Sequence, residues 1–261
     1  MIKVALDAGH GLKTAGKRTP DGEREWTFNH KVALAAAASL RNYQKVKILR
    51  LDDPSGKNDV PLKTRTDLAN RWGADVLVSI HHNAYLGKWG THGGVETYTF
   101  PRASQKSRDI ANVIHPLVVK AMGLRDRGMK TMNLHIVRES KMPAILIEGG
   151  FMDSTIDILA IRDNKKLTAS GQAVARGIAN YFNLKIINSG SKVIVYRYGD
   201  TGPAIGLLQK NLTKLGFNLA IDNSFGPITL SVVKDFQNRK GLTVDGIVGP
   251  LTQQKIANLL R

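Results

Sequence analysis

The segment GADVLVSIHHNA (residues 73–84) decides the fold, because it runs a long apolar stretch directly into two histidines and an asparagine. Residues 74–80 are rich in Val, Leu and Ile, which predicts a strand in the centre of a sheet. The start of the chain repeats this arrangement, since the apolar part of IKVALDAGHG (2–11) leads directly to His10. Polar side chains at the ends of buried strands are typical of a surface where a ligand binds.

Strand-like and helix-like segments alternate along the first two thirds of the chain. This alternation predicts an α/β fold, with a mostly parallel twisted sheet and helices on both of its faces. The expected strands cover residues 2–7, 46–51, 74–80, 94–100, 134–139 and 143–149. The expected helices cover residues 26–42, 61–73, 103–122 and 165–182.

Three of the expected strands bring metal-competent side chains to one edge of the sheet. His10, His81 and Glu148 each lie at, or just after, the end of an apolar strand. In sheets of this kind, ligands bind beyond the carboxyl ends of the strands. We therefore expect these three side chains to meet at that edge, although they come from distant stretches of sequence.

The C-terminal third of the chain has a different composition and contains an internal repeat. Residues 184–195 are expected to link a catalytic domain (1–183) to a smaller domain (196–261). In the smaller domain, DNSFGPIT (222–229) recurs as DGIVGPLT (245–252). Each Gly-Pro-x-Thr opens a helical run and a further helix precedes them, so we expect a small all-α domain of about three helices. Such a regular bundle is more typical of a binding module than of a catalyst.

Composition and charge restrict the class of protein. The 261 residues include no cysteine, which excludes disulfides and thiolate metal ligands. A net charge of +17 attracts polyanions such as nucleic acid, anionic lipid or cell-wall polymers, or is simply a solvated surface. With only 6% aromatics and no long basic run, nucleic acid is not the expected partner. No apolar run approaches the ~18 residues of a membrane span, and the N-terminus lacks the pattern of a secretory signal.

A zinc site without cysteine needs histidine and carboxylate ligands, plus an open position for water if the site is catalytic. His10 and His81 are the leading candidates for two of the ligands. The expected helix start PDGEREWTFN offers Glu23 or Glu25 as the third, and Glu25 shares a helix face with Asn29. The alternative for Glu25 is a helix-start carboxylate that is favoured only by the helix dipole.

Hydrolysis at such a centre also needs a group that accepts a proton from water, and Glu148 is the candidate. It follows the apolar run AILI (144–147), so desolvation is expected to raise the pKa of its carboxyl. Two glycines follow it and allow close approach of a substrate. The alternative is a structural ion pair between Glu148 and an arginine. His82 is expected to point away from His81, because side chains alternate along a strand.

Taken together, these motifs resemble a known family. The segments VALDAGHG, EREWTFN, TRTDLANRWGADVLVSIHHNA, GGVETY and MPAILIEGGFMD resemble, in this order, those of the zinc-dependent N-acetylmuramoyl-L-alanine amidases of bacterial autolysins and phage endolysins. The resemblance extends over about residues 2–182 and rests on the combination rather than on one motif. Residues 196–260, with GDTGPAIGLLQKNLTKLG and the two repeated turns, resemble the helical peptidoglycan-binding domain found beside such hydrolases.

The resemblance implies a complete site and selects Glu25 over Glu23. The implied Zn²⁺ ligands are His10, Glu25 and His81, and the implied catalytic proton acceptor is Glu148. Asn83 and Arg65 are the expected substrate-binding residues, with the alternative that Arg65 only supports the site from behind. Two positions depart from the family pattern without removing a ligand. His82 stands where a small residue is usual, and Trp26 where a polar residue is usual.

The implied reaction is hydrolysis of the amide between the lactyl group of N-acetylmuramic acid and L-alanine of the peptidoglycan stem peptide. A phage endolysin is then expected, made in the host cytoplasm without a signal peptide and released to act on the wall, with non-classical secretion as the alternative. The basic surface suits a wall rich in anionic polymers. Two other functions stay open at this point: a non-catalytic wall-binding protein, and a metallopeptidase that cuts within the stem peptide.

Overall fold

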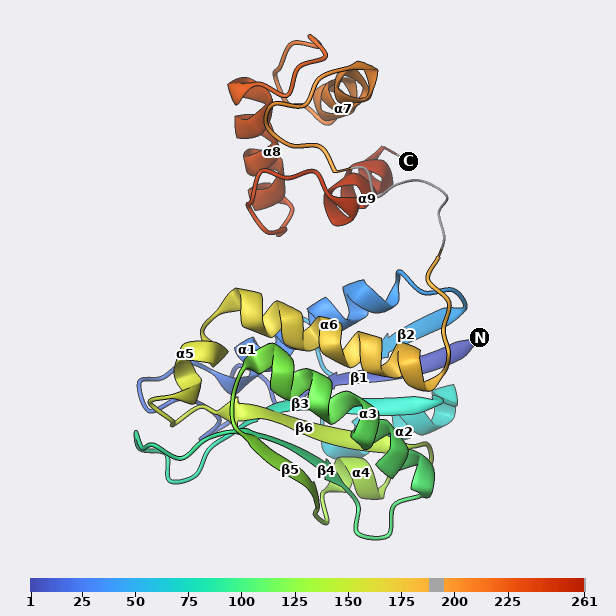
Figure 1. The fold of residues 1–261 in the computed structure, drawn as a ribbon, viewed down its shortest axis with the longest axis vertical. Coiled ribbons are helices and arrows are strands. Elements are labelled where there is room, and N and C mark those ends of the chain that lie inside the picture. Colours follow the sequence, from blue (N-terminus) through green and yellow to red (C-terminus); the bar gives the residue numbers. More distant parts are fainter. Residues whose placement is uncertain (188–194, 261) are drawn as a thin grey trace. The chain divides into compact units, whose positions relative to one another are not determined.

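The computed structural model describes residues 1–187 and 195–260, and Figure 1 traces the chain. The chain divides into two compact units, residues 1–187 and 188–261. Of the expected linker (184–195), residues 188–194 lie outside the described residues. Among the described helices, none is both long and apolar enough to cross a membrane.

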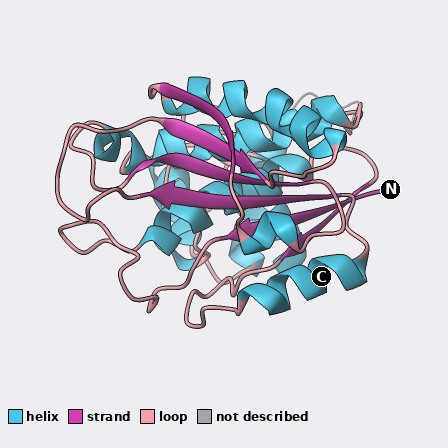
Figure 2. Cartoon of the chain, turned by 90° about the horizontal axis from the view of Figure 1, so that it is seen from below, coloured by secondary structure: helices cyan, strands magenta, loops and turns pink. Residues whose placement is uncertain are grey.

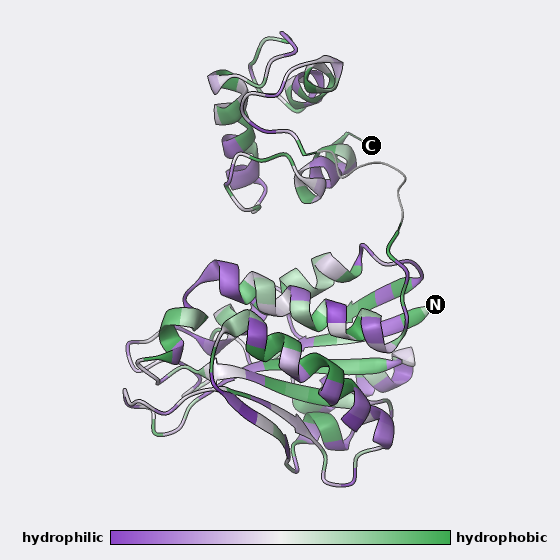
Figure 3. Cartoon of the chain, viewed as in Figure 1, coloured by the Kyte–Doolittle hydropathy of each residue, from purple (hydrophilic) through white to green (hydrophobic). Residues whose placement is uncertain are grey.

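The N-terminal unit is built on a six-stranded sheet with the strand order β2-β1-β3-β6-β4-β5. Neighbouring strands are parallel, except that β4 runs antiparallel to β6. The central strands β1, β3 and β6 carry apolar side chains on both faces (green in Figure 3). Both faces are therefore covered by other elements, and the strands are largely buried. The strands are β1 (Ile2–Ala8), β2 (Val46–Arg50), β3 (Val76–Asn83), β4 (Val95–Thr99), β5 (Asp126–Thr131) and β6 (Ala144–Phe151).

Helices cover both faces of this sheet (Figure 2), which confirms the α/β fold with a mostly parallel sheet. Apolar side chains of α1, α3, α5 and α6 pack against one face. Those of α2 and α4 pack against the other. The helices are α1 (Glu25–Leu40), α2 (Leu62–Trp72), α3 (Gln105–Met122), α4 (His135–Arg138), α5 (Asp157–Ile161) and α6 (Asn164–Tyr181).

Helices α1 and α6 approach each other closely because small residues make their contact. A Cβ atom on Gly171 of α6 would lie 2.3 Å from the carbonyl oxygen of Val32 in α1, so only glycine permits this packing. The buried Ala36 of α1 lies at the same contact. The close packing fixes α1 against its neighbour, and it therefore fixes the position of Glu25, the first residue of α1.

Three local features differ from the prediction made from sequence. Residues 134–139, expected as a strand, contain the short helix α4 instead, with Ile136 and Val137 buried. Short apolar runs do not distinguish a strand from a buried helix. The sequence does not predict the edge strand β5, because DRGMKT is hydrophilic (purple in Figure 3) and largely accessible to water. It also does not predict α5, which is only five residues long.

The C-terminal unit contains α7 (Pro203–Lys214), α8 (Pro227–Arg239) and α9 (Pro250–Leu259), which confirms the expected small helical domain. Each of the three helices begins with a proline that follows a glycine. Proline suits this position because its missing N–H would have no partner within the helix.

The sequence repeat builds the same hydrogen-bonded cage twice in this unit. Gln209 Nε2 donates to Asp222 Oδ1 at 2.7 Å and to Thr229 Oγ1 at 3.0 Å. Gln209 Oε1 accepts the backbone N–H of Asn223 at 3.0 Å. The corresponding residues of the second cage are Gln237, Asp245, Thr252 and Gly246. The repeated Asp and Thr thus serve as internal partners for a buried glutamine in each copy.

Candidate active site

The carboxyl ends of β1 and β3 and the start of α1 bring three side chains together. His10 follows β1, His81 lies near the end of β3, and Glu25 begins α1. Glu25 Oε2 is 3.3 Å from His10 Nε2, and Glu25 Oε1 is 3.0 Å from His81 Nδ1. One possible ligand atom from each residue lies within 4.8 Å of the other two. Two imidazole nitrogens and a carboxylate in this arrangement can hold one divalent cation.

The backbone before and at residue 10 is specialised to bring the two imidazoles together. His10 has a φ of 66°, in the left-handed region that non-glycine residues seldom adopt. A Cβ atom on Gly9 would lie 2.0 Å from Cε1 of His81 and 2.2 Å from its Nε2. Because no side chain tolerates such contacts, glycine at position 9 is what lets the two rings meet with centroids 4.8 Å apart.

Asn29 is fully buried one helical turn after Glu25 and ties the site together. Its Nδ2 donates to the Gly9 carbonyl at 3.1 Å and to Glu25 Oε1 at 3.2 Å. Its Oδ1 therefore faces Nδ1 of His82, at 2.8 Å, and accepts the proton of that nitrogen. His82 is thus directed toward Asn29 of α1, whereas the ring of His81 is directed toward Gly9 and Glu25.

Burial and pairing shift the pKa values of the three clustered residues in different directions. Burial lowers the pKa of His10 to about 4, and the nearby Glu25 carboxylate opposes this only in part. Burial alone would raise the pKa of Glu25, but the hydrogen bond with His81 and the charges of the two imidazoles bring it down to about 2. Burial also acts against charge on His81, yet the hydrogen bond with Glu25 outweighs it and raises its pKa. A cation that binds here would compete with protons for the two imidazoles.

Glu148 lies beside this cluster on the next strand, since it pairs with His81 across β3 and β6. Its Oε2 is buried and has no hydrogen-bond partner among the described residues. Burial raises the pKa of its carboxyl to about 8, with His81 opposing the shift and Glu25 adding to it. In the described residues Glu148 forms no ion pair with an arginine, and a carboxyl with a pKa near neutrality is suited to proton transfer.

A cavity of about 480 Å³ opens over these residues. Its lining includes His10, His81 and Glu148 together with residues 59–62 and 134–136. This volume lies within the ordinary range for small-molecule sites, so it can receive a short segment of a polymer.

Comparison with known proteins identifies the family. The family model described as N-acetylmuramoyl-L-alanine amidase matches residues 4–180. The chain belongs to this amidase family. The C-terminal unit of the amidase is matched over residues 201–256 by the model of a putative peptidoglycan binding domain.

Individual relatives agree with this assignment. The amidase is 36% identical over 190 residues to the sporulation-specific N-acetylmuramoyl-L-alanine amidase of Bacillus subtilis (strain 168), which covers 72% of this chain and 71% of that protein. It is 32% identical over 195 residues to the endolysin of Bacillus phage SPP1, covering 72% and 69%. Among solved structures, the catalytic domain of CwlV, an amidase from Bacillus (Paenibacillus) polymyxa var. colistinus, has 33% identity and a TM-score of 0.65, covering 71% of this chain and 100% of that one. The protein is therefore a peptidoglycan amidase. Of the three functions that the sequence left open, this finding favours the amidase over a non-catalytic wall-binding protein and over a metallopeptidase that cuts within the stem peptide.

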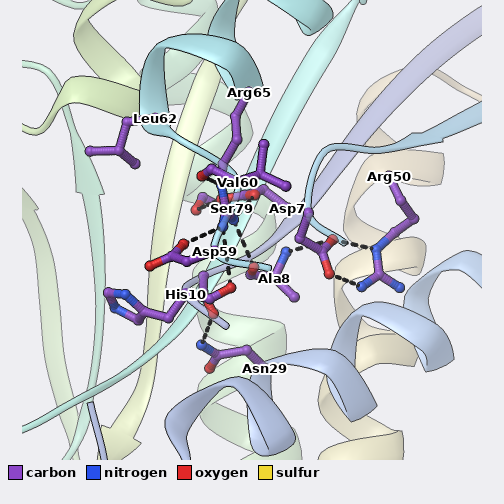
Figure 4. Close-up of polar contacts among 12 residues, drawn as sticks. Asp7, Ala8, His10, Asn29, Arg50, Asp59, Val60, Leu62, Arg65 and Ser79 are labelled. Atoms are coloured by element: carbon purple, nitrogen blue, oxygen red, sulfur yellow. Dashed lines mark hydrogen bonds and ion pairs between the residues drawn. The ribbon is translucent and has the colours of Figure 1, made fainter. Parts of the chain in front are cut away.

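Arg65 of α2 is 1% exposed and is committed to the fold of the amidase (Figure 4). Its acceptors, at 2.6 to 3.2 Å, are the carboxylates of Asp7 and Asp59 and the carbonyls of Ala8, His10 and Val60. These contacts use all five N–H groups of the guanidinium, so none is left for a substrate. The expectation that Arg65 binds substrate is therefore not supported, and the contact with the His10 carbonyl favours the alternative of support from behind.

Asn83 ends β3, and both ends of its side-chain amide bind to the protein. Nδ2 donates to Glu96 Oε2 at 3.2 Å, and Oδ1 accepts the N–H of Ala84 at 2.8 Å. A role in orienting ligand or substrate stays a prediction. Glu96 of β4, which binds the Asn83 amide, is 1% exposed and was not among the site residues expected from the sequence. Its signal was a carboxylate inside the strand-like run VETYT.

Proposed function

We propose that the amidase is zinc-dependent, with Zn²⁺ held by His10, Glu25 and His81. The donor set carries this proposal, since two imidazole nitrogens and a carboxylate oxygen lie within 4.8 Å of one another. The buried Nε2 of His10 has no hydrogen-bond partner among the described residues, so it is available to a cation. With no cysteine in the chain, two His and one Glu form a donor set that suits catalytic zinc and leaves a position for water.

Bound at this position, zinc would polarise the scissile carbonyl and lower the pKa of the attacking water. The positive charge of a bound cation would favour the ionised form of the nearby Glu148. The proton transfers then fall to this carboxylate, which accepts the proton of that water at Oε2 and passes it to the departing amine of L-alanine. A C–O bond forms and the amide C–N bond breaks, which leaves a lactyl carboxylate and a new amino terminus. Asn29 holds Glu25 in place, and Arg65 holds the backbone of His10.

Elemental analysis and product mapping together test the zinc-dependent reaction. The purified amidase is expected to contain about one zinc ion per chain, to lose activity with a chelator and to regain it with Zn²⁺. Digested peptidoglycan should yield free muramic-acid lactyl groups and new L-alanine amino termini. Activity that persists after complete removal of metal, or new reducing-sugar or glycine ends in place of these products, would contradict the proposal.

The finer biological role that we propose is that of a phage endolysin, released from the host cytoplasm to act on the wall. The 32% identity to the endolysin of Bacillus phage SPP1 supports this role, as does the C-terminal match to a peptidoglycan binding domain. Produced in the cytoplasm of a bacterium whose wall it cleaves, the amidase should leave the cells intact until their membrane is permeabilised. Lysis without permeabilisation would instead support secretion by a non-classical route.

A further inference from the structure

A cluster of charged side chains around the buried Glu96 carboxylate lies near the catalytic centre, outside the residues assigned to the metal. Arg127 of the edge strand β5 donates from Nε to Glu96 Oε1 at 2.5 Å, and Lys130 Nζ of the same strand donates to the same oxygen. The other oxygen, Glu96 Oε2, accepts the Tyr98 hydroxyl at 2.6 Å and the Asn83 amide at 3.2 Å. Two cations share one carboxylate, so the cluster keeps one positive charge in excess.

Arg127 is firmly held, but its outer edge is open. Its Cζ lies 5.1 Å from the centroid of the Phe151 ring, so the guanidinium rests on an aromatic face. Nε is bound by Glu96, whereas neither Nη group has an acceptor among the described residues. The side chain is 29% exposed. A guanidinium held at one edge and one face is preorganised to bind a carboxylate through two parallel hydrogen bonds.

The register of the sheet places this open edge near the reaction. Glu148 of β6 pairs with His81 of β3 on one side and with Glu96 of β4 on the other. Side chains at paired positions leave the same face of a sheet, so these three form one row. Neighbouring strands lie ~4.8 Å apart, which puts Glu96 one strand spacing, and the backbone of Arg127 two spacings, from Glu148.

We propose that Arg127 and Lys130 bind the free carboxylate of the second stem-peptide residue. The amidase should then prefer stem peptides in which this group is a carboxylate over those in which it is an amide. This rests on the proposed function, because it takes the scissile amide to lie at the cluster of His10, Glu25 and His81. An extended peptide advances ~3.3–3.6 Å per residue, so a carboxylate on the second residue lies ~7 Å from the scissile bond. That distance falls between one and two strand spacings, the range set by Glu96, to which Arg127 is bonded, and by the backbone of Arg127. A stem peptide carries such a carboxylate when its second residue is glutamate joined through its side chain.

The test compares two soluble substrates, disaccharide tetrapeptides with either D-glutamate or D-isoglutamine as the second residue. The full-length, zinc-loaded amidase is expected to cleave the acid with a kcat/KM about 10- to 100-fold above that of the amide, the range for a charged hydrogen bond. In Arg127→Gln this ratio should fall to near unity, mainly through a higher KM for the acid. Lys130→Gln should lower the ratio by a smaller factor.

Two further variants separate charge from geometry. Arg125→Gln removes an exposed charge from the same region and should keep the wild-type activity and ratio. Arg127→Lys keeps the charge, loses the fork and should retain part of the preference, which also provides a test if the glutamine variant does not fold. A wild-type ratio near unity, an unchanged ratio in Arg127→Gln, or an equal loss on both substrates each overturns the subsite while the amidase proposal stands. Cleavage of neither substrate by the wild-type enzyme overturns both.

Discussion

The two units of the molecule differ in how completely their buried polar side-chain atoms are paired. In the C-terminal unit, Gln209 and Gln237 are each 1% exposed, and both ends of each amide are bonded inside the repeated cage. In the N-terminal unit, three buried side-chain atoms have no hydrogen-bond partner among the described residues: His10 Nε2, His82 Nε2 and Glu148 Oε2. Leaving a buried polar atom unpaired costs ~1–3 kcal/mol. Paired polar groups thus stabilise the C-terminal unit, whereas two of the unpaired atoms, His10 Nε2 and Glu148 Oε2, are those that the proposed function assigns to a cation and a proton.

The largest effect should come from Glu148→Gln, which removes one of these available atoms. A neutral amide cannot accept the proton of water, so kcat should fall by roughly 10²–10⁴-fold. Zinc content and wall binding should stay at wild-type levels, because Glu148 is neither a proposed ligand nor part of the C-terminal unit. Product release, elemental analysis and co-sedimentation with insoluble walls measure the three properties. Cleavage at the wild-type rate would exclude the assigned role.

Gly9→Ala should disturb the metal site next most strongly. The added methyl would overlap the ring of His81, and displacement of a ligand is expected to lower zinc affinity by ~10- to 100-fold. A competition titration with a chromophoric chelator measures this. Gly226→Ala in the C-terminal unit is the matched control, because its Cβ would meet nothing within 4 Å. Equal zinc affinity in both variants would show that the close contact at position 9 is not needed.

Gln209→Ala should break one of the two fully paired cages of the C-terminal unit. It leaves the Asp222 carboxylate and the Asn223 N–H without this partner, so the C-terminal unit should lose ~1–3 kcal/mol of unfolding free energy. Binding to insoluble walls should weaken with it, whereas cleavage of soluble muropeptides should not change. Denaturant-induced unfolding of the wild type and of each variant measures the loss of unfolding free energy. The exposed Lys210→Ala, one residue away on α7, serves as the control.

The smallest effect concerns a buried carboxylate that is fully paired within the N-terminal unit. Asp153 Oδ2 accepts the backbone N–H groups of Tyr85, Leu86 and Gly87, and Oδ1 is 2.7 Å from Nε2 of His92. Burial would raise the pKa of Asp153, but the hydrogen bond with His92 and the backbone N–H groups outweigh it and hold the pKa below the usual 3.8. The folded state therefore binds fewer protons than the unfolded state near this pH. The resulting stability is complete above pH 3.8 and is lost as the pH falls below it.

Asp153→Asn tests this dependence. The variant should be less stable than the wild type by about 1 kcal/mol at pH 7, because an amide accepts these hydrogen bonds less strongly. The gap should close as the pH falls below the usual aspartate value, since the wild type then loses its charge as well. Thermal unfolding of both proteins from pH 7 to pH 3 measures the gap. A gap that does not change with pH would show that the charge of Asp153 is not its source.

The class of fold and the location of the site were determined by local patterns in the sequence. Apolar runs in alternation with helical segments predict a sheet between two layers of helices, because side-chain periodicity follows backbone geometry directly. The ends of the runs at His10, His81 and Glu148 place polar groups at one sheet edge. The repeated Gly-Pro-x-Thr predicts two of the C-terminal helices in the same way, through the conformation of proline at a helix start.

Only the tertiary structure decided which of these groups meet and which are already in use. It brought Glu25 from the helix layer to the two imidazoles, paired all donors of Arg65 with acceptors of the fold, and placed Glu96 beside Arg127 of a hydrophilic edge strand. It also turned residues 135–138 into a helix rather than a strand. These outcomes depend on contacts between residues far apart in the chain. Their free energy comes from packing, desolvation and pairing across elements, which no local pattern reports.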